Sequence, residues 1–172
     1  LVRYADDFVM VFEHESDARR VYAALPKRLE RFGLTLHPEK TRLLDHRRPR
    51  QDGSGPRPGT FVFLGFTHFW GVSFPQRRWI PKRKTAADRF RRGLAKIKEW
   101  MVTVRHVPIP FQAQMLRAKI RGHSQYYGII GNSHSVGHFI RHVARLWQRC
   151  LSRRSQRGMT WEAFRALLQR YP

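Results

Sequence analysis

The sequence has one cysteine, few acidic residues and no long apolar segment. The single cysteine, Cys150, excludes an internal disulfide bond and a zinc site built from several thiolates, and it fits a reducing compartment. No apolar stretch approaches the roughly 20 residues that span a bilayer, and acids interrupt the short apolar run in residues 1–12. We therefore expect a globular, cytoplasmic protein without a membrane segment or a signal peptide.

The shortage of acids leaves a large positive charge. The chain of 172 residues carries 34 Lys and Arg against 12 Asp and Glu, a formal net charge of +22. Residues 1–45 hold eight residues of each sign, whereas residues 46–172 hold 26 bases and four acids. Such a field repels itself unless a polyanion neutralises it, so it favours nucleic acid as the partner. An anionic membrane surface is the alternative partner, and the lack of an apolar span disfavours it.

The N-terminal half predicts short strands and one helix. The β-prone runs LVRY and FVMVF flank Ala5-Asp6-Asp7, as the strands of a β-hairpin flank its turn. Residues 16–33 predict a helix with Ser16 as the N-cap and Gly33 as the stop, kinked or split at Pro26. After it we expect, in order, two short extended pieces around a turn, a loop, a strand and its partner strand: residues 34–44, 46–59, 60–69 and 71–81.

From Pro81 onward the apolar residues recur at helical spacing. Four helices are predicted, and the second is bounded by Pro110 and Gly122: residues 82–104, 108–122, 133–154 and 160–171, the last with Thr160 as its cap. The predicted fold class is therefore α+β. Residues 1–80 would hold a hairpin, a helix and short strands, and residues 81–172 an all-α bundle.

The adjacent acids Asp6 and Asp7 sit between two apolar runs. A solvated β-turn is the ordinary interpretation of two aspartates at a turn. A divalent cation is the alternative, because hard carboxylate oxygens suit Mg²⁺, which shares its coordination sphere with substrate phosphates. Pairs of such ions stabilise the attacking and leaving oxygens in phosphoryl transfer.

Five sequence blocks occur in the order and spacing of a known family. YADD between apolar strands resembles the catalytic palm hairpin of reverse transcriptases, and GLTLHPEKT and FVFLGF resemble the next two blocks of that family. RGHSQYYGIIGNSHSV and WQRCLSRRSQRGMTWEAF are similar to the thumb and maturase-specific region of group II intron-encoded reverse transcriptases. The resemblance thus implies a partial palm in residues 1–80 and a thumb with a maturase region in residues 81–172.

The resemblance also implies roles for single residues. Asp6 and Asp7 match the aspartates that bind the two catalytic Mg²⁺ ions, with Asp6 the firmer ligand. Lys40 matches a lysine near the triphosphate, where a cation offsets charge on the leaving pyrophosphate; on position alone it reads as a surface lysine.

Three further residues match positions at the primer and nucleotide. Tyr4 could stack beside the primer terminus, the small Ala5 would leave room for a base pair, and Gly65 would let the backbone approach the primer. A simple β-bulge is the other interpretation of Gly65.

Palms of this family need a third carboxylate on an upstream strand, together with upstream fingers. No later Asp replaces that carboxylate, so we expect this chain to be the C-terminal part of a longer enzyme and to be inactive in isolation. Some members of the family carry the Cys/His cluster of an HNH nuclease, and because the given sequence contains none we do not expect DNA cleavage.

Cations of the C-terminal half form two groups. The resemblance assigns them to the thumb and to RNA binding, whereas a solvated face is the other interpretation. They are Lys82, Arg83, Lys84, Arg89, Arg91 and Arg92 on the first long helix, and Arg141, Arg145, Arg149, Arg153 and Arg154 on the third.

Histidines and aromatic residues in this half are candidates for zinc binding and for stacking on bases. His134, His138 and His142 share one helix face, but with no Cys, Asp or Glu nearby we expect a polar or RNA-facing stripe rather than a zinc site. QYYG at 125–128 and Trp161 could stack on bases, although we expect them to lie mostly in the core.

The predicted function is RNA-templated DNA synthesis with dNTPs as substrates and a template–primer duplex, together with binding of intron RNA that assists splicing. An RNA-binding maturase without polymerase activity is the alternative, and an intact YADD disfavours it. Retron, CRISPR-associated and diversity-generating reverse transcriptases share the palm blocks, and the maturase-like blocks disfavour them.

Overall fold

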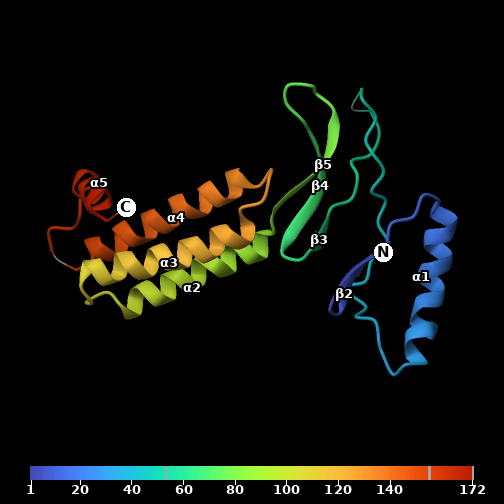
Figure 1. Ribbon diagram of the computed structural model, residues 1–172, viewed down its shortest axis with the longest axis horizontal. Helices are drawn as coiled ribbons and strands as arrows, with labels where there is room; N and C mark the ends of the chain where they lie inside the picture. Colours follow the sequence, from blue (N-terminus) through green and yellow to red (C-terminus); the bar gives the residue numbers. More distant parts are fainter. Residues whose placement is uncertain (53, 155, 172) are drawn as a thin grey trace. The chain divides into compact units, whose positions relative to one another are not determined.

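The computed structural model describes residues 1–52, 54–154 and 156–171, which form two small antiparallel sheets and five helices (Figure 1). This mixed content confirms the predicted fold class. The chain divides into two compact units, described separately below. The N-terminal unit comprises Leu1–Leu64 and His68–Lys82, and the C-terminal unit comprises Gly65–Thr67 and Arg83–Pro172.

The predicted N-terminal hairpin is confirmed. Strands β1 (Val2–Tyr4) and β2 (Asp7–Val9) pair antiparallel, with Tyr4 opposite Asp7. The turn is shorter than expected, because Asp7 already belongs to β2 and only Ala5 and Asp6 connect the strands. Ala5 has a φ of +51°, a left-handed conformation that is rare for residues with a Cβ and common in tight hairpin turns.

Helix α1 (Glu15–Glu30) differs from the prediction at its start and at Pro26. His14, with an extended backbone, is the N-cap instead of Ser16, which places the acids Glu15 and Asp17 in the positively polarised first turn. Pro26 lies inside the helix without splitting it.

The stop at Gly33 is confirmed. Gly33 has a φ of +67°, its N–H donates to the Glu30 carbonyl, and the Leu34 N–H donates to the Leu29 carbonyl. This pattern satisfies the last carbonyls of the helix and is typical of a glycine terminator. Residues 34–44 contain a turn at 38–40 and no strand, so the extended pieces predicted there do not pair into a sheet.

The second sheet has the order β3–β4–β5, from β3 (Phe61–Phe63), β4 (Phe66–Val72) and β5 (Trp79–Thr85). The single strand expected over 60–69 is therefore a hairpin, and the bend expected at Gly65 is its turn. Leu64 and Gly65 both have positive φ, +49° and +77°, as the favoured two-residue hairpin turn requires. A β-bulge at Gly65 is thus excluded.

Four helices follow the sheet: α2 (Ala87–Thr103), α3 (Ile109–Tyr127), α4 (Ser133–Ser152) and α5 (Trp161–Arg170). α2 begins five residues later than predicted, because β5 continues to Thr85 and Ala86 is the N-cap. α3 begins before Pro110, which occupies its first turn, and passes through Gly122 to Tyr127. The predicted Thr160 cap is confirmed, since its hydroxyl accepts a hydrogen bond from the Ala163 N–H at 3.2 Å.

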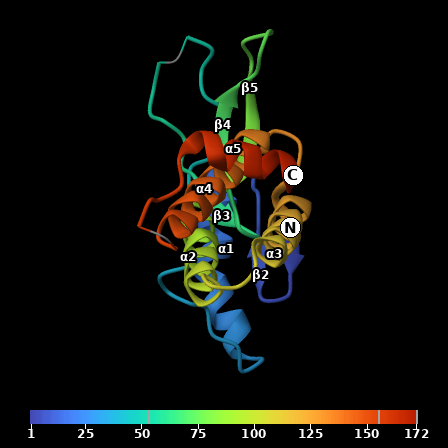
Figure 2. The same ribbon diagram turned by 90° about the vertical axis from the view of Figure 1, so that its left-hand side faces the viewer.

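Helices α2, α3 and α4 run side by side, and α5 packs across the end of α4 (Figures 1 and 2). The apolar residues that recur at helical spacing in α2 and α4 supply most of the core, although Ile140 of α4 is 39 % exposed. No described residue of the N-terminal unit is buried. The buried apolar cluster lies in the bundle and consists of Ile97, Met101, Ala113, Leu116, Phe139, Val143, Trp147, Cys150, Leu151 and Phe164.

A buried glutamine joins three helices of the bundle. The side-chain amide of Gln112, which is 0 % exposed, donates to the carbonyls of Val104 at 2.8 Å and Val107 at 2.9 Å. Its Oε1 accepts a hydrogen bond from the Trp147 indole N–H at 3.0 Å. Gln112 therefore satisfies carbonyls at the end of α2 and anchors α4 to α3.

A buried asparagine performs the same role at the other end of the bundle. The Oδ1 of Asn132 accepts from the Thr85 N–H at 3.0 Å, and its Nδ2 donates to the Thr85 hydroxyl and the Tyr127 carbonyl. This one side chain therefore joins the last residue of β5 to the connection between α3 and α4.

Replacing Gln112 by alanine should lower the free energy of unfolding by about 2–4 kcal/mol, because it removes the hydrogen bonds to the Val104 and Val107 carbonyls, leaves the Trp147 indole N–H without its acceptor and opens a cavity. Urea denaturation followed by circular dichroism measures this change. Gln125→Ala, at an exposed position of the same helix, is the matched control and should change stability by less than about 0.5 kcal/mol. Equal effects of the two substitutions would contradict the structural role of Gln112.

Candidate metal and nucleic-acid sites

The two aspartates at the tip of the first hairpin are exposed to solvent. Asp6 and Asp7 are both exposed, and within the described part of the chain neither carboxylate makes a hydrogen bond or an ion pair. Arg3 stabilises the turn, because its Nε–H donates a hydrogen bond to the Ala5 carbonyl at 2.8 Å. The two carboxylates therefore belong to adjacent, solvent-exposed residues, and no cationic side chain of the described residues pairs with either of them.

The strand register brings two of the predicted site residues together. Tyr4 and Asp7 face each other across the strands, and directly opposed side chains project from the same face of an antiparallel pair. The Tyr4 ring is 66 % exposed, so it offers an aromatic surface beside the Asp7 carboxylate. Ala5 and Asp6 form the turn next to this pair.

The donor set at the tip fits a magnesium ion in part. Two carboxylates supply the hard oxygen ligands that Mg²⁺ prefers, and Mg²⁺ is ordinarily held by one or two protein carboxylates with waters and phosphates completing its sphere. Across residues 1–52, 54–154 and 156–171, no three His, Cys, Asp or Glu side chains gather as a metal site. The tip can therefore hold an ion that shares its remaining ligands with a substrate, and it cannot enclose one.

Lys40 lies apart from these contacts. It ends the turn at 38–40, where its N–H donates to the His37 carbonyl at 3.2 Å, and its side chain is exposed. No hydrogen bond or ion pair of the described residues joins it to the hairpin.

The local structure explains why position 65 is a glycine. A Cβ added there would meet the Tyr127 hydroxyl oxygen at 3.1 Å, and the positive φ already disfavours any other residue. Its carbonyl accepts the Ala86 N–H at 2.9 Å, just before α2 begins. These contacts explain the glycine without a primer.

The first group of cations is divided between two elements, so the prediction that all six lie on a helix is wrong. Lys82, Arg83 and Lys84 belong to β5, because the strand continues until Asn132 binds Thr85. The Lys82 ammonium donates to the Val72 carbonyl on the neighbouring strand at 2.7 Å.

The cations on α2 are partly neutralised. Arg92 forms an ion pair with Asp88 at 2.7 Å, and Arg89 approaches the same carboxylate at 3.7 Å. Arg91 is exposed on this helix.

The second group forms a regular row on α4. Arg141, Arg145 and Arg149 on α4 and Arg153 at its C-cap are exposed and recur every fourth residue, about 6 Å apart along the helix axis, and we call them the α4 stripe. None of them has an ion-pair partner among the described residues. The stripe is therefore an uncompensated line of positive charge.

Arg154 does not belong to that row. Its guanidinium is half-buried and donates to the Val107 carbonyl at 3.2 Å, so it faces the loop between α2 and α3. The prediction that it continues the exposed band is wrong, because α4 ends at Ser152 and Arg154 lies in the turn that follows, where its backbone N–H donates to the Leu151 carbonyl at 3.0 Å.

The histidines continue the polar face of α4 toward its N-terminus. The rings of His134 and His138 lie 4.4 Å apart between centroids, and His142 packs edge-on against Phe90 at 5.9 Å. Desolvation by its neighbours lowers the pKa of the exposed His138, and Arg141, His134, His142 and Arg145 lower it further. Neutral imidazole is thus favoured beside the arginines.

The aromatics of QYYG behave differently from one another. Tyr127 is half-buried and its hydroxyl lies next to Gly65, which agrees with the expected position in the core. Tyr126 is 55 % exposed and stacks on Phe66 at 6.0 Å between ring centroids. Trp161 is 48 % exposed, and its ring lies edge-on to that of Phe164 with 5.7 Å between the ring centroids. The prediction that Tyr126 and Trp161 lie in the core is therefore wrong.

The comparison with known families matches residues 1–68 to the model described as reverse transcriptase (RNA-dependent DNA polymerase). This segment contains Tyr4, Ala5, Asp6, Asp7, Lys40 and Gly65, and it is similar to that family in general. No curated protein and no solved structure matches the chain. A search for helices long and apolar enough to cross a membrane finds none in the described residues.

Replacing Arg141 by glutamine should raise the pKa of His138 toward its ordinary value of 6.5, because one of the charges that disfavour imidazolium is removed. NMR titration of the imidazole signals measures the midpoint. Arg153→Gln is the matched control, since it lies fifteen residues away, about 22 Å along the helix and beyond the screening length of roughly 10 Å. A His138 midpoint that responds equally to both substitutions would contradict the local effect of Arg141.

Proposed function

We propose that the chain is part of an RNA-directed DNA polymerase of the group II intron-encoded type, which also binds intron RNA and assists its splicing. One observation carries the proposal: an exposed Tyr-Ala-Asp-Asp hairpin, with no cation paired to its carboxylates, lies in a segment similar to reverse transcriptases. The strongly positive remainder of the chain supports nucleic acid as the substrate and partner.

In this proposal each residue of the hairpin has a separate task. Asp6 and Asp7 hold divalent ions, which when bound stabilise the attacking and leaving oxygens of nucleotide transfer. The Tyr4 ring, exposed on the face of Asp7, stacks against the primer terminus, and Ala5 leaves space for the new base pair. Lys40 offsets the charge of the leaving pyrophosphate of the dNTP.

The basic residues of the other elements bind the template–primer duplex and intron RNA. Lys82, Arg83 and Lys84 present cations from a strand, and Arg91 from α2. The α4 stripe is the strongest candidate for phosphate contacts, because it has no acidic partner to displace before it binds.

An RNA-binding maturase without polymerase activity is the second candidate. It is favoured by the donor set at the hairpin, which has two carboxylates and no third metal ligand among the described residues. The two candidates share RNA binding and differ in nucleotide transfer, so a primer-extension assay separates them.

Asp6→Asn, introduced into the full product of the reading frame that encodes this chain, should reduce Mg²⁺-dependent primer extension on an RNA template by at least about a thousandfold, because an amide cannot replace the carboxylate charge on the ions. RNA affinity, measured by filter binding, should remain within about twofold. Asp17→Asn, in the first turn of α1, is a matched control and should leave extension unchanged.

The outcomes of this assay are distinct. Wild-type protein that binds RNA and extends no primer favours the binding-only maturase. Extension that survives Asp6→Asn would contradict the role of the hairpin.

Charge removal on the α4 stripe should flatten the salt dependence of RNA binding. Replacing Arg141, Arg145 and Arg149 together by glutamine should reduce the slope of log K against log salt by about 2–3, since each phosphate contact on a nucleic-acid strand contributes roughly 0.7–0.9. Fluorescence anisotropy between 50 and 300 mM KCl measures the slope. The same number of substitutions at Arg19, Arg89 and Arg92, which already pair with carboxylates, should change it less.

A further inference from the structure

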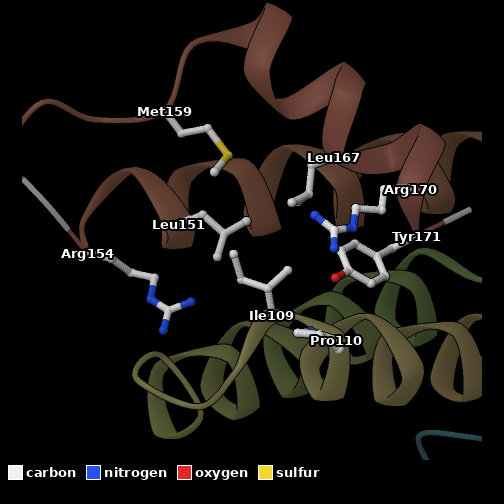
Figure 3. A pocket seen from close by; sticks show the side chains of 8 residues that line it. All are labelled: Ile109, Pro110, Leu151, Arg154, Met159, Leu167, Arg170 and Tyr171. Carbon is white, nitrogen blue, oxygen red and sulfur yellow. The ribbon is translucent and has the colours of Figure 1, made fainter.

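A hollow of about 570 Å³ opens where the ends of α3, α4 and α5 meet (Figure 3). Its apolar wall consists of Ile109 at the start of α3, Leu151 near the end of α4, Met159 before α5 and Leu167 within α5. The Met159 and Ile109 side chains point into the space from opposite sides (Figure 3). A volume of this size accommodates a small planar molecule.

The rim of the hollow is cationic on two sides. In Figure 3 the Arg170 guanidinium and the Tyr171 hydroxyl lie on one side of Ile109, and the Arg154 guanidinium lies on the other. The Arg170 guanidinium carbon stands 5.6 Å from the centre of the Tyr171 ring, a cation–π contact that orders both side chains. No acidic residue is among those that line the space.

Donor groups at the rim remain for a ligand. A guanidinium carries five N–H donors, and the described hydrogen bonds engage one donor of Arg154, toward the Val107 carbonyl. The rim therefore combines two fixed positive charges with a hydroxyl that can donate to a polar edge.

We propose that this hollow binds one unpaired nucleotide of an RNA strand. The base lies against Ile109, Leu151, Met159 and Leu167, the Tyr171 hydroxyl bonds its edge, and its phosphates contact Arg154 and Arg170. Single-stranded RNA is recognised in this way, by bases turned out of the stack into apolar and aromatic surroundings. The inference rests on the proposed RNA binding and adds a specific site for it.

The surroundings favour an RNA strand over an apolar ligand. The α4 stripe ends at Arg153, the neighbour of Arg154, so a strand whose phosphates follow the stripe arrives at the rim. An uncharged lipid or apolar peptide would leave the two guanidinium groups beside it without an anion, which costs desolvation without compensation.

Filling the hollow tests the inference without changing charge. Met159→Trp should weaken the binding of a 12-nucleotide single-stranded RNA about tenfold, the loss expected when one base contact is removed. Its affinity for a blunt 12-base-pair RNA duplex should stay within twofold, because a paired base cannot enter. Both affinities are measured by fluorescence anisotropy at one salt concentration, and circular dichroism checks that the variant is folded.

A second pair of variants keeps the test independent of Met159. Arg170→Ala should weaken single-strand binding more than Arg165→Ala, a matched exposed arginine of the same helix that does not line the hollow. In the Met159→Trp background the two alanine substitutions should have equal effects.

Four outcomes would count against the inference or its basis. Wild-type protein that binds no RNA refutes the proposed function itself. RNA binding that Met159→Trp leaves unchanged, or weakens equally for single strand and duplex, refutes the nucleotide site alone. Displacement of the RNA oligomer by micromolar 5′-AMP would assign the site to a free nucleotide instead of a strand.

Discussion

Two buried side-chain amides hold the helical bundle in register. Gln112, which is fully buried, donates to the partly buried carbonyls of Val104 and Val107 and accepts the Trp147 indole N–H, which would lose its acceptor without it, a cost of about 1–3 kcal/mol. Asn132 does the same for Thr85 and Tyr127 at the opposite end. The α4 stripe and the hollow between the start of α3, the end of α4 and α5 lie on the bundle that these two amides help to hold together.

The two units are stabilised by different means. All of the buried apolar residues of the described chain, from Ala86 to Phe164, lie in the C-terminal unit. The N-terminal unit, which buries no described residue, is held by hydrogen bonds. Some are local, as in the two-residue turn that Arg3 contacts and the end of α1 at Gly33. Others join distant residues, since the Trp70 indole N–H donates to the His46 carbonyl at 2.9 Å. The proposed chemistry thus lies on the hairpin with little core of its own, and the proposed RNA contacts lie on a packed bundle.

What could be predicted from the sequence followed from local rules. The hairpin, the stop at Gly33, the Thr160 cap and the apolar faces of α2 and α4 each depend on neighbouring residues or on a simple period. The end of β5 depends on Asn132, 47 residues from Thr85, and no local signal marks that bond. Arg154 and Tyr171 likewise line one hollow only in the folded chain, so the hollow could not be predicted from the sequence.

The distribution of acids explains which cations are available to a polyanion. Asp88 engages Arg89 and Arg92, and Glu15 engages Arg19, so these arginines must give up an ion pair before they bind phosphate. The last 127 residues contain only four acids, and none of them pairs with the α4 stripe within the described chain. Counting positive residues alone treats all of these arginines as equal. Because an exposed ion pair offsets most of the field of its arginine, the unpaired α4 stripe is the part of the chain from which the proposed attraction of nucleic acid would chiefly come, and the hollow beside its last residue is where the proposed strand would meet an apolar surface.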